Sequence, residues 1–367
     1  MGPIQAFKSF HPLISFLVSP MAIKDVKNMG KDYGKDLPKG DYLDCALAHN
    51  PFGCSTLVVE ELKKLGFHDI HLYPNNDEKL KEALAEFWNV KNDQIFLGTG
   101  SMGCLQKINK LLTPGSVVLG YSPQFLPYIN DARLNGAVYH YVPLLREEDF
   151  TIDVSRIIAQ IDERTTFVYV DNPNNPTGQI LKLKEIEELA EEAGRKGAIL
   201  IVDEAFGEFM EKKNSAINLE YPNVVVTRSF SKGFGLAGLR IGYCVVEGKE
   251  MRELLFKVDF PFSITNISIR AALKALEDTE FLKKTIKKTK KSKEKTIREL
   301  GRRFHIAKTH KTTPIFLCGG QKDTYGYFLQ KGILTVPGSE FMNLDDSYVR
   351  IRVPNDVDEL LTRISSA

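Results

Sequence analysis

The feature that most constrains the fold is an alternation of apolar, β-branched runs with helix-like stretches, extending from about residue 94 to residue 246. Strands that alternate with helices are typical of a mostly parallel sheet covered by helices on both faces. In such a sheet, ligands lie beyond the carboxyl ends of the strands, so polar residues directly after the apolar runs are the first candidates for a functional site. We predict seven strands in this region, at Gln94–Leu97, Ser116–Gly120, Val138–Val142, Thr166–Val170, Ala198–Val202, Asn223–Thr227 and Leu239–Val246.

The pattern changes after about Asp259. Helices are predicted at Ile267–Leu276, Glu280–Arg303 and Val357–Ile364, and strands at Thr313–Cys318, Ile333–Val336 and Tyr348–Val353. We therefore predict an α/β protein with a large domain at residues 46–258 and a smaller α+β domain formed by residues 1–45 and 259–367, since a chain of 367 residues is long enough for both.

Composition excludes several classes of function. The net charge of +2 gives no global attraction to nucleic acid, and the lysine-dense stretch at residues 283–295 is interpreted as a solvated helix face because no interleaved aromatics accompany it. No run reaches the ~20 apolar residues of a membrane-spanning helix. The five cysteines form no CxxC pair, so we expect a reducing, cytoplasmic location and no metal site.

Lys232 stands in the segment Ser229-Phe-Ser-Lys-Gly-Phe-Gly-Leu-Ala-Gly-Leu-Arg240, between two apolar runs. A lone lysine in a loop is usually a solvated surface group. The glycines here, however, allow the backbone to approach a ligand closely, and Ser229, Ser231 and Arg240 supply donors suited to a phosphate dianion. The segment therefore predicts a lysine that reacts beside a phosphate site.

Asp203 ends the apolar run Ala198–Val202, so its carboxylate is expected to be partly desolvated, which is costly for an unpaired charge. Asp at such a junction often caps a helix. A protonated pyridine nitrogen would also compensate the charge, and the carboxylate would in turn keep that nitrogen protonated.

Two further loops follow predicted strands. The rigid loop Asp171-Asn-Pro-Asn-Asn-Pro-Thr-Gly178 presents Asn175, and Gly98-Thr-Gly-Ser-Met-Gly103 leads into a helix whose free backbone N–H groups suit a phosphate. Each loop alone is a weak signal. A lysine able to form a Schiff base, a carboxylate for a ring nitrogen and a set of phosphate donors are together what pyridoxal phosphate (PLP) needs from a protein.

These motifs resemble those of the fold-type I PLP enzymes, specifically the class I/II aminotransferases and, among them, the histidinol-phosphate aminotransferase-like group. The resemblance covers about residues 50–352, and the three motifs at Asn175, Asp203 and Lys232 are highly specific in combination and order. It implies the type I PLP-dependent transferase fold and an aminotransferase that works in two half-reactions through pyridoxamine phosphate.

The resemblance also implies roles for individual residues. Lys232 would form the Schiff base and carry a proton between the substrate Cα and the cofactor C4′, Asp203 would pair with the pyridine nitrogen, and Asn175 would contact O3′. Phe125 would stack on the ring. The phosphate would be held by Ser101, the backbone N–H of Met102, Ser229, Ser231 and Arg240.

Two more roles concern the substrate and the partner subunit. Arg350 matches the arginine that grips the substrate carboxylate, although an ordinary surface position on a strand is the alternative. Tyr73, in Leu-Tyr-Pro, matches the tyrosine that reaches the phosphate of the neighbouring subunit, which implies a homodimer with shared active sites. Small-molecule donors and 2-oxo acids are then the expected partners, with no nucleic acid and no membrane.

Three residues depart from the family pattern. Phe206 stands where many relatives have a tyrosine that donates to O3′, so we expect the Schiff base to keep its proton to higher pH. His49 lies in Ala-His-Asn-Pro, where histidinol-phosphate enzymes have Asn-Glu-Asn-Pro, and either faces the substrate or is an ordinary loop histidine. Arg352 shares a strand face with Arg350 and either adds a second cation near the carboxylate site or pairs with a structural acid.

Two other functions remain open from the sequence. A decarboxylase of a phosphorylated amino acid would share the fold and the cofactor, and Phe206 fits that class as well. A non-enzymatic, aminotransferase-like regulator is the remote alternative, because the aminotransferase pattern begins by about residue 45 and leaves no room for a preceding winged-helix module.

Overall fold

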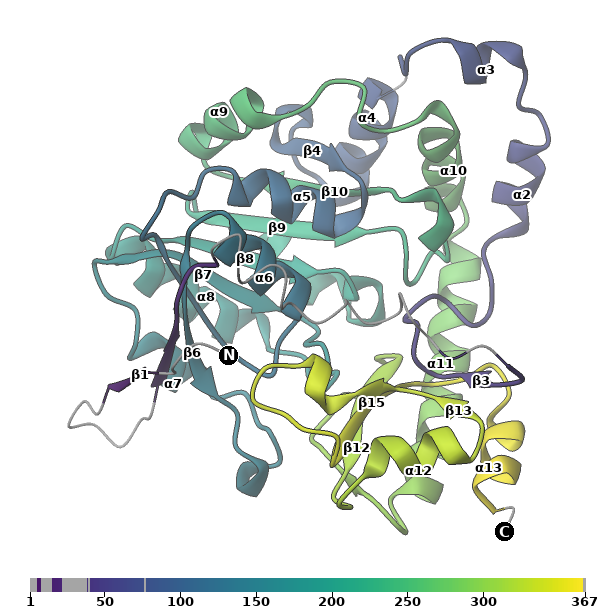
Figure 1. The fold of residues 1–367 in the computed structure, drawn as a ribbon. Helices are drawn as coiled ribbons and strands as arrows, with labels where there is room; N and C mark the ends of the chain where they lie inside the picture. The colour runs from purple at the N-terminus through teal and green to yellow at the C-terminus, as the bar shows by residue number, and fades with distance from the viewer. Residues whose placement is uncertain (1–4, 8–14, 22–37, 39, 76, 366–367) are drawn as a thin grey trace.

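The large sheet contains all seven predicted strands (Figure 1). The computed structural model describes residues 5–7, 15–21, 38, 40–75 and 77–365. The strand order is β1-β2-β6-β5-β7-β8-β9-β10-β4. Strands β6, β5, β7, β8 and β9 are parallel neighbours, whereas β10 pairs antiparallel with both β9 and β4. The seven strands are β4 (Ile95–Gly98), β5 (Val117–Ser122), β6 (Val138–Pro143), β7 (Thr165–Asp171), β8 (Ile199–Glu204), β9 (Val224–Ser229) and β10 (Gly242–Val246).

Two strands of the N-terminal segment extend this sheet. β1 (Gln5–Phe7) pairs with β2 (Ser15–Val18), and β2 pairs antiparallel with the edge strand β6. This pairing differs from the expected assignment of residues 1–45 to the small domain. The physical reason is that β6 would otherwise leave its backbone N–H and C=O groups unpaired at the sheet edge. The expected boundaries near residues 45 and 258 stay a prediction.

Helices cover both faces of the sheet, and the two sides of each buried strand pack against different helix layers. Side chains such as Val168, Val170 and Val202 join a cluster with α4, α7, α8 and α10, whereas Phe167, Tyr169 and Ile201 pack towards α5, α6 and α9. This alternation is the period of two expected for a strand that is buried on both faces. The helices are α4 (Asp77–Trp88), α5 (Gly100–Asn109), α6 (Leu126–Leu134), α7 (Val154–Ile158), α8 (Leu183–Arg195), α9 (Lys249–Val258) and α10 (Asn266–Glu277).

A smaller α+β part follows along the chain, coloured yellow-green in Figure 1. Its sheet has the order β11-β12-β15-β14, and a separate pair joins β13 in parallel to β3 (Leu43–Asp44). The predicted strand at 333–336 is thus divided between two sheets. The elements are α11 (Thr279–Leu300), β11 (His305–Ile306), β12 (Ile315–Gly319), α12 (Thr324–Gln330), β13 (Ile333–Leu334), β14 (Val336–Pro337), β15 (Tyr348–Arg352) and α13 (Val357–Ser365).

Short elements complete the described chain. The helices α2 (Thr56–Leu62) and α3 (Phe67–His71) lie at the outer side of the molecule in Figure 1 and connect β3 to α4. The 3₁₀ helices are η1 (Asn92–Gln94), η2 (Arg146–Glu148), η3 (Gly207–Phe209), η4 (Lys212–Asn214), η5 (Ala216–Asn218), η6 (Ala237–Leu239) and η7 (Gly338–Glu340). Within the described ranges, no helix is both long enough and apolar enough to cross a membrane.

Candidate active site

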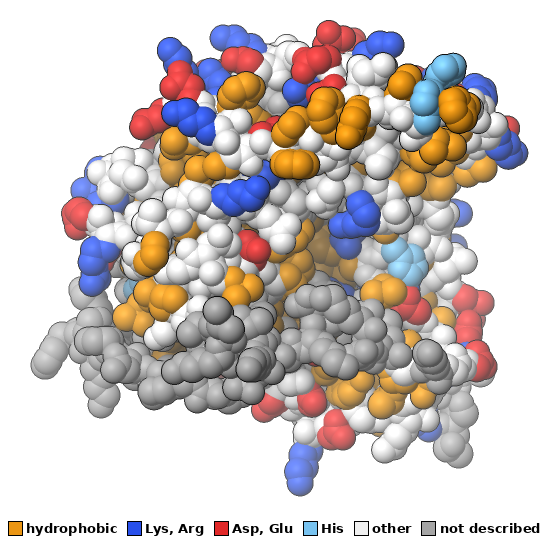
Figure 2. Space-filling view, turned by 45° about the horizontal axis from the view of Figure 1, so that its top comes forward, with side chains coloured by type: hydrophobic (Ala, Val, Ile, Leu, Met, Phe, Trp, Pro, Cys, Tyr) orange, Lys and Arg blue, Asp and Glu red, His pale blue; other side chains and the backbone are white. Residues whose placement is uncertain are grey.

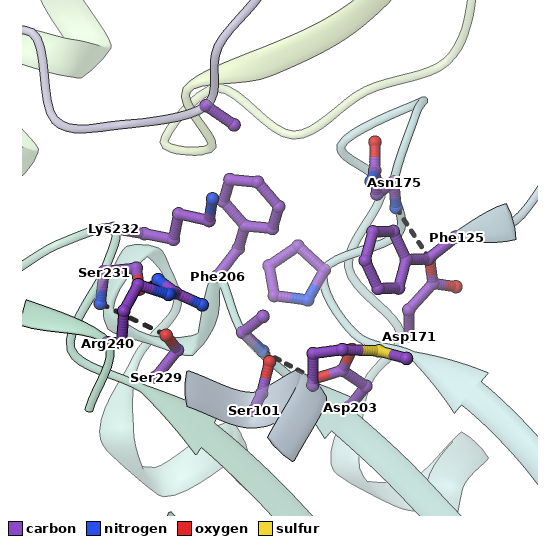
Figure 3. Close-up of a pocket in the computed structure, with 14 residues that line it drawn as sticks. Ser101, Phe125, Asp171, Asn175, Asp203, Phe206, Ser229, Ser231, Lys232 and Arg240 are labelled. Carbon is purple, nitrogen blue, oxygen red and sulfur yellow. Dashed lines mark hydrogen bonds between the residues drawn. The ribbon is translucent and has the colours of Figure 1, made fainter. Parts of the chain in front are cut away.

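A cavity of about 640 Å³, part of it open to solvent, lies at the carboxyl ends of β7, β8 and β9, where the sequence places its polar loops (Figure 3). The fold therefore gathers the predicted loops around one space. The lining residues are Ala48, Ser101, Met102, Phe125, Asp171, Pro173, Asn175, Asp203, Ala205, Phe206, Ser229, Ser231, Lys232 and Arg240.

Asp203 is a buried carboxylate on the floor of the cavity. Its Oδ1 accepts hydrogen bonds from Thr227 Oγ1 at 2.8 Å and from the Ala205 backbone N–H at 3.1 Å, while its Oδ2 receives a longer bond from Tyr169 at 3.3 Å. Burial raises the pKa of Asp203 to about 6, although the bond from Thr227 opposes that shift. A cationic N–H in the cavity would favour the charged form of this group.

The next residue along β8 serves the opposite face of the sheet. Glu204 is fully buried and binds Arg228 at 2.8 Å, and Arg228 also binds Glu208 at 2.8 Å. The guanidinium of Arg228 lies 4.8 Å from the centroid of the Trp88 ring. In the register of β8 and β9, Asp203 is opposite Thr227 and Glu204 is opposite Arg228, so the carboxylate in the cavity and the buried ion pair occupy alternate positions.

Lys232 enters the cavity from the loop after β9. Its Nζ lies 5.4 Å from the centroid of the Phe206 ring, within the range of a cation–π contact. Burial, together with the positive charges of Arg350 and Arg240, lowers the pKa of Lys232 from 10.5 to about 7. A large share of this amine is therefore neutral near neutral pH, which is the state required of a nucleophile or a proton acceptor.

Hydroxyl and guanidinium groups gather beside Lys232, on the side of the cavity opposite Phe125 (Figure 3). Arg240 donates to Ser231 Oγ at 3.2 Å, and Ser229 Oγ accepts from the Ser231 N–H at 3.1 Å. Ser101 and Met102 stand in the first turn of α5. Glycine is favoured at position 100 beside them because its φ of +79° is one that other residues rarely adopt; a Cβ there would also lie 2.9 Å from an Arg240 guanidinium nitrogen. The group has the donors that a phosphate dianion needs.

Phe125 and Asn175 line the cavity as predicted, and Asp171 lines it without having been assigned a role. Asp171 ends β7 in register with Asp203 at the end of β8, and both are 3% exposed. The signal for it was available, since Asp171 follows a buried strand just as Asp203 does. Tyr169 and Thr227, which hydrogen-bond Asp203, lie inside strands and carried no signal of their own.

Arg350 contacts the lining residue Asn175 but does not itself line the cavity, and the other three candidates also lie outside the lining. Arg350 is fully buried on β15 and donates to Asn175 Oδ1 at 3.0 Å, so it is not a surface residue. His49 is partly exposed beside Asp44, with Nδ1 3.7 Å from its Oδ2, and burial lowers its pKa. Tyr73 is 77% exposed and its ring packs at 4.9 Å from that of Phe262.

Arg352 shares the face of β15 with Arg350, as strand alternation predicts, but its guanidinium is engaged by structural partners. Its Nε donates to the Leu47 carbonyl at 2.7 Å, and its Nη2 lies 3.4 Å from Asp44 Oδ2 and also bonds the Asp44 carbonyl. Of the two expected alternatives for Arg352, its contacts therefore match pairing with a structural acid, Asp44.

The chemical groups that line the cavity fit those that bind PLP. An amine with a lowered pKa, a buried carboxylate and a cluster of hydroxyl and guanidinium donors line the same cavity. An aromatic ring at Phe125 offers a stacking surface. Among the residues that the structure describes, no cluster of His, Cys, Asp and Glu could hold a metal ion.

Comparisons with known proteins agree with this geometry. A model of the family described as aminotransferase class I and II matches residues 40–364. A histidinol-phosphate aminotransferase of Methanococcoides burtonii is 31% identical over 333 residues, or 90% of each chain. The histidinol-phosphate aminotransferase of Sinorhizobium meliloti, solved in complex with pyridoxal-5'-phosphate, has a TM-score of 0.76 at 23% identity and covers 88% of this chain and 89% of its own. The L-threonine-O-3-phosphate decarboxylase of Porphyromonas gingivalis has a TM-score of 0.74 at 25% identity, with coverages of 87% and 98%.

Proposed function

Because the chain belongs to the class I and II aminotransferases and is a PLP-dependent transaminase, we propose that Lys232 and Asp203 carry its chemistry. The observation that supports these two roles is their position in one cavity, with a lysine of lowered pKa facing the space and a buried carboxylate on its floor. The proposed reaction moves an amino group between an amino acid or amino-phosphate and a 2-oxo acid.

The residues around the cavity would hold the cofactor by its separate groups. Asp203 would hold the ring nitrogen, Phe125 would pack on the ring and Asn175 would contact O3′. The phosphate would be bound by Ser101, the N–H of Met102, Ser229, Ser231 and Arg240. When bound, PLP supplies an aldehyde that links to amines and a ring that withdraws electrons from the substrate Cα.

Lys232 has two tasks in this proposal. Its neutral amine would hold the cofactor covalently, and the same Nζ would accept a proton from the substrate Cα and later donate it back. A pKa of about 7 suits both directions of transfer, because neither the neutral nor the charged amine is then rare at neutral pH.

Arg350 and His49 are the proposed contacts of the substrate. Arg350 is proposed for the substrate carboxylate because the family resemblance assigns it that role and its guanidinium contacts Asn175, which lines the cavity. His49 lies one residue after the lining residue Ala48 and is partly exposed, which suits contact with a distal polar group. Histidinol phosphate is the first donor to examine, since the Methanococcoides burtonii relative carries that name.

Decarboxylation is the second candidate, and two observations favour it over other reactions. The Porphyromonas gingivalis neighbour is a decarboxylase of a phosphorylated amino acid, and Phe206 is placed directly against Lys232. Release of carbon dioxide without a requirement for a 2-oxo acid distinguishes this outcome from transamination.

A homodimer with shared sites is the proposed assembly. Large apolar side chains, Tyr73 among them, are exposed near α3 and near the end of α9. Figure 2 shows hydrophobic groups gathered along the upper part of the face. Exposed apolar surface of this kind marks protein–protein contacts. The exposed residues are Phe67, Ile70, Leu72, Tyr73, Phe256, Phe260 and Phe262. The five free cysteines support a reducing, cytoplasmic location.

A half-reaction screen tests the proposed function. Protein loaded with PLP is mixed separately with each amino acid, with histidinol phosphate and with O-phospho amino acids, while the absorption spectrum is recorded. Conversion to the pyridoxamine form by one compound identifies the donor class. Carbon dioxide release without that conversion favours the decarboxylase, and no spectral response to any compound contradicts both.

A further inference from the structure

We propose that Asp171 is a positioning residue that fixes Asn175 and, through it, Arg350, so that the cofactor cavity and the substrate arginine are held in one arrangement. This inference rests on the proposed function of the same site. It assigns a task to a buried acid that the roles above leave unused.

The two carboxylate oxygens of Asp171 have different partners. Oδ1 accepts from Tyr121 at 2.8 Å, from Gln124 at 3.1 Å and from Asn174 at 3.0 Å. Oδ2 accepts from the backbone N–H of Asn175 at 2.9 Å, which Figure 3 shows as a dashed line. One oxygen therefore anchors the side chain in the wall of the cavity, and the other holds the loop residue that faces the space.

Asn175 continues the chain of contacts into the small part of the molecule. Its side-chain Oδ1 accepts from Arg350 Nη1 at 3.0 Å, and Arg350 Nη2 also donates to the Ala46 carbonyl. Because a guanidinium only donates, Oδ1 must face Arg350, and the Nδ2 group of Asn175 is turned away from it. The orientation of this amide thus depends on Asp171 at its backbone and on Arg350 at its tip.

Burial makes this arrangement specific for a carboxylate. Asp171 is 3% exposed, and Tyr121, Gln124 and Asn174 are fully buried, so water cannot replace a lost acceptor. In Asp171→Asn, one oxygen becomes an NH₂ group. If this group faces Asn175, it meets the backbone N–H, and if it faces the other way, it meets the amide donors of Gln124 and Asn174. Either orientation brings two donors together, and the loop must shift.

Tyr121→Phe is the matched control. It removes one buried hydrogen bond to the anchoring oxygen Oδ1 and leaves intact the hydrogen bond that the Asn175 backbone N–H donates to Oδ2. We expect both variants to lower the melting temperature of the apo-protein. Asp171→Asn alone should raise the PLP dissociation constant, measured by fluorescence titration of the apo-protein. It should also raise, by ~10-fold or more, the half-saturation concentration for whichever of L-glutamate and histidinol phosphate converts the wild-type protein.

A double-substitution cycle tests the route of the effect. In an Asn175→Ala background, adding Asp171→Asn should change neither constant by more than about twofold, because the side chain that Asp171 positions is already lost. The proposal is overturned if Asp171→Asn and Tyr121→Phe lower stability and leave both constants unchanged, or if Asp171→Asn keeps its full effect without the Asn175 side chain.

Two further arms keep the test decisive. If Asp171→Asn does not fold, Asp171→Ser, which is smaller and need not direct a donor at Asn175, takes its place in both comparisons. If the wild-type protein converts neither compound, the PLP dissociation constants of the four proteins in the cycle still decide whether Asp171 acts through Asn175.

Discussion

The lowered pKa of Lys232 makes the capture of PLP by the apo-protein depend on pH in a defined way. An exposed lysine with a pKa of 10.5 is almost entirely charged at neutral pH, whereas a pKa of about 7 leaves half of the amine neutral. The ratio of the two neutral fractions at pH 7 is roughly a thousandfold. We expect the rate of covalent capture to rise with pH, with a midpoint near 7 and a plateau above it.

The assay mixes apo-protein with PLP and follows the cofactor absorption between pH 5.5 and pH 10, as about ten separate points that span several units around the expected midpoint. Because PLP itself titrates, each rate is divided by the rate for a simple alkylamine at the same pH. Lys232→Ala serves as the blank. In Arg350→Gln the midpoint should move to higher pH, because the Arg350 charge is, after burial, the leading cause of the lowered pKa. A wild-type midpoint above 9, or a midpoint unaffected by Arg350→Gln, would refute this account of the amine.

Other substitutions test the remaining roles. Asp203→Asn removes the charge that keeps a ring nitrogen protonated, so kcat should fall by about a hundredfold or more. Steady-state kinetics on fully loaded protein measures kcat, and an unchanged value would contradict the role of Asp203. Phe206→Tyr adds a hydroxyl donor and should move the spectral transition of the loaded protein to lower pH, whereas an unmoved transition in the titration argues against it. Lys232→Ala should abolish turnover and keep the fold; since the lysine pKa is lowered in the folded state, wild-type apo-protein should also gain stability as pH rises from 7 to 10.5, and denaturant titrations should show that gain diminished in the variant. Mixing inactive Tyr73→Ala and Lys232→Ala proteins under subunit exchange should restore part of the activity, and no recovery despite proven mixed dimers would exclude shared sites.

Much of the large sheet and its cavity could be predicted because each functional loop follows a buried strand. Asp203 and Lys232 were found in this way, and the fold brings them to one cavity because parallel strands end at the same edge. The same rule applied equally to Asp171. It was passed over because the family pattern assigns no role to the first position of that loop, not because the local signal was weaker.

The contacts that could not be predicted depend on segments far apart in the chain. Strand alternation placed Arg350 and Arg352 on one face, but only the fold shows that the Asp44 carboxylate and three backbone carbonyls engage Arg352. Likewise, nothing local in β2 indicates that it pairs with β6, since an edge strand accepts any extended segment with compatible register. His49 and Tyr73 remain predictions, because their proposed partners are a substrate and a second subunit.

Because Asp203 and Glu204 alternate along β8, this enzyme should tolerate substitutions in the strand differently from deletions. Replacing Asp203 or Thr227 alters the electronic environment of the cavity and leaves the Glu204–Arg228 pair untouched, so the reactivity of the site can be redesigned without loss of the ion pair beneath. Deleting a single residue within the strand is a different matter. The shift would direct Glu204 into the cavity and leave Arg228 with Glu208 but without Glu204, exchanging the functions of the two faces in one step. Adaptation of this scaffold to new reactions is therefore open to substitution in β8 and closed to insertion or deletion there.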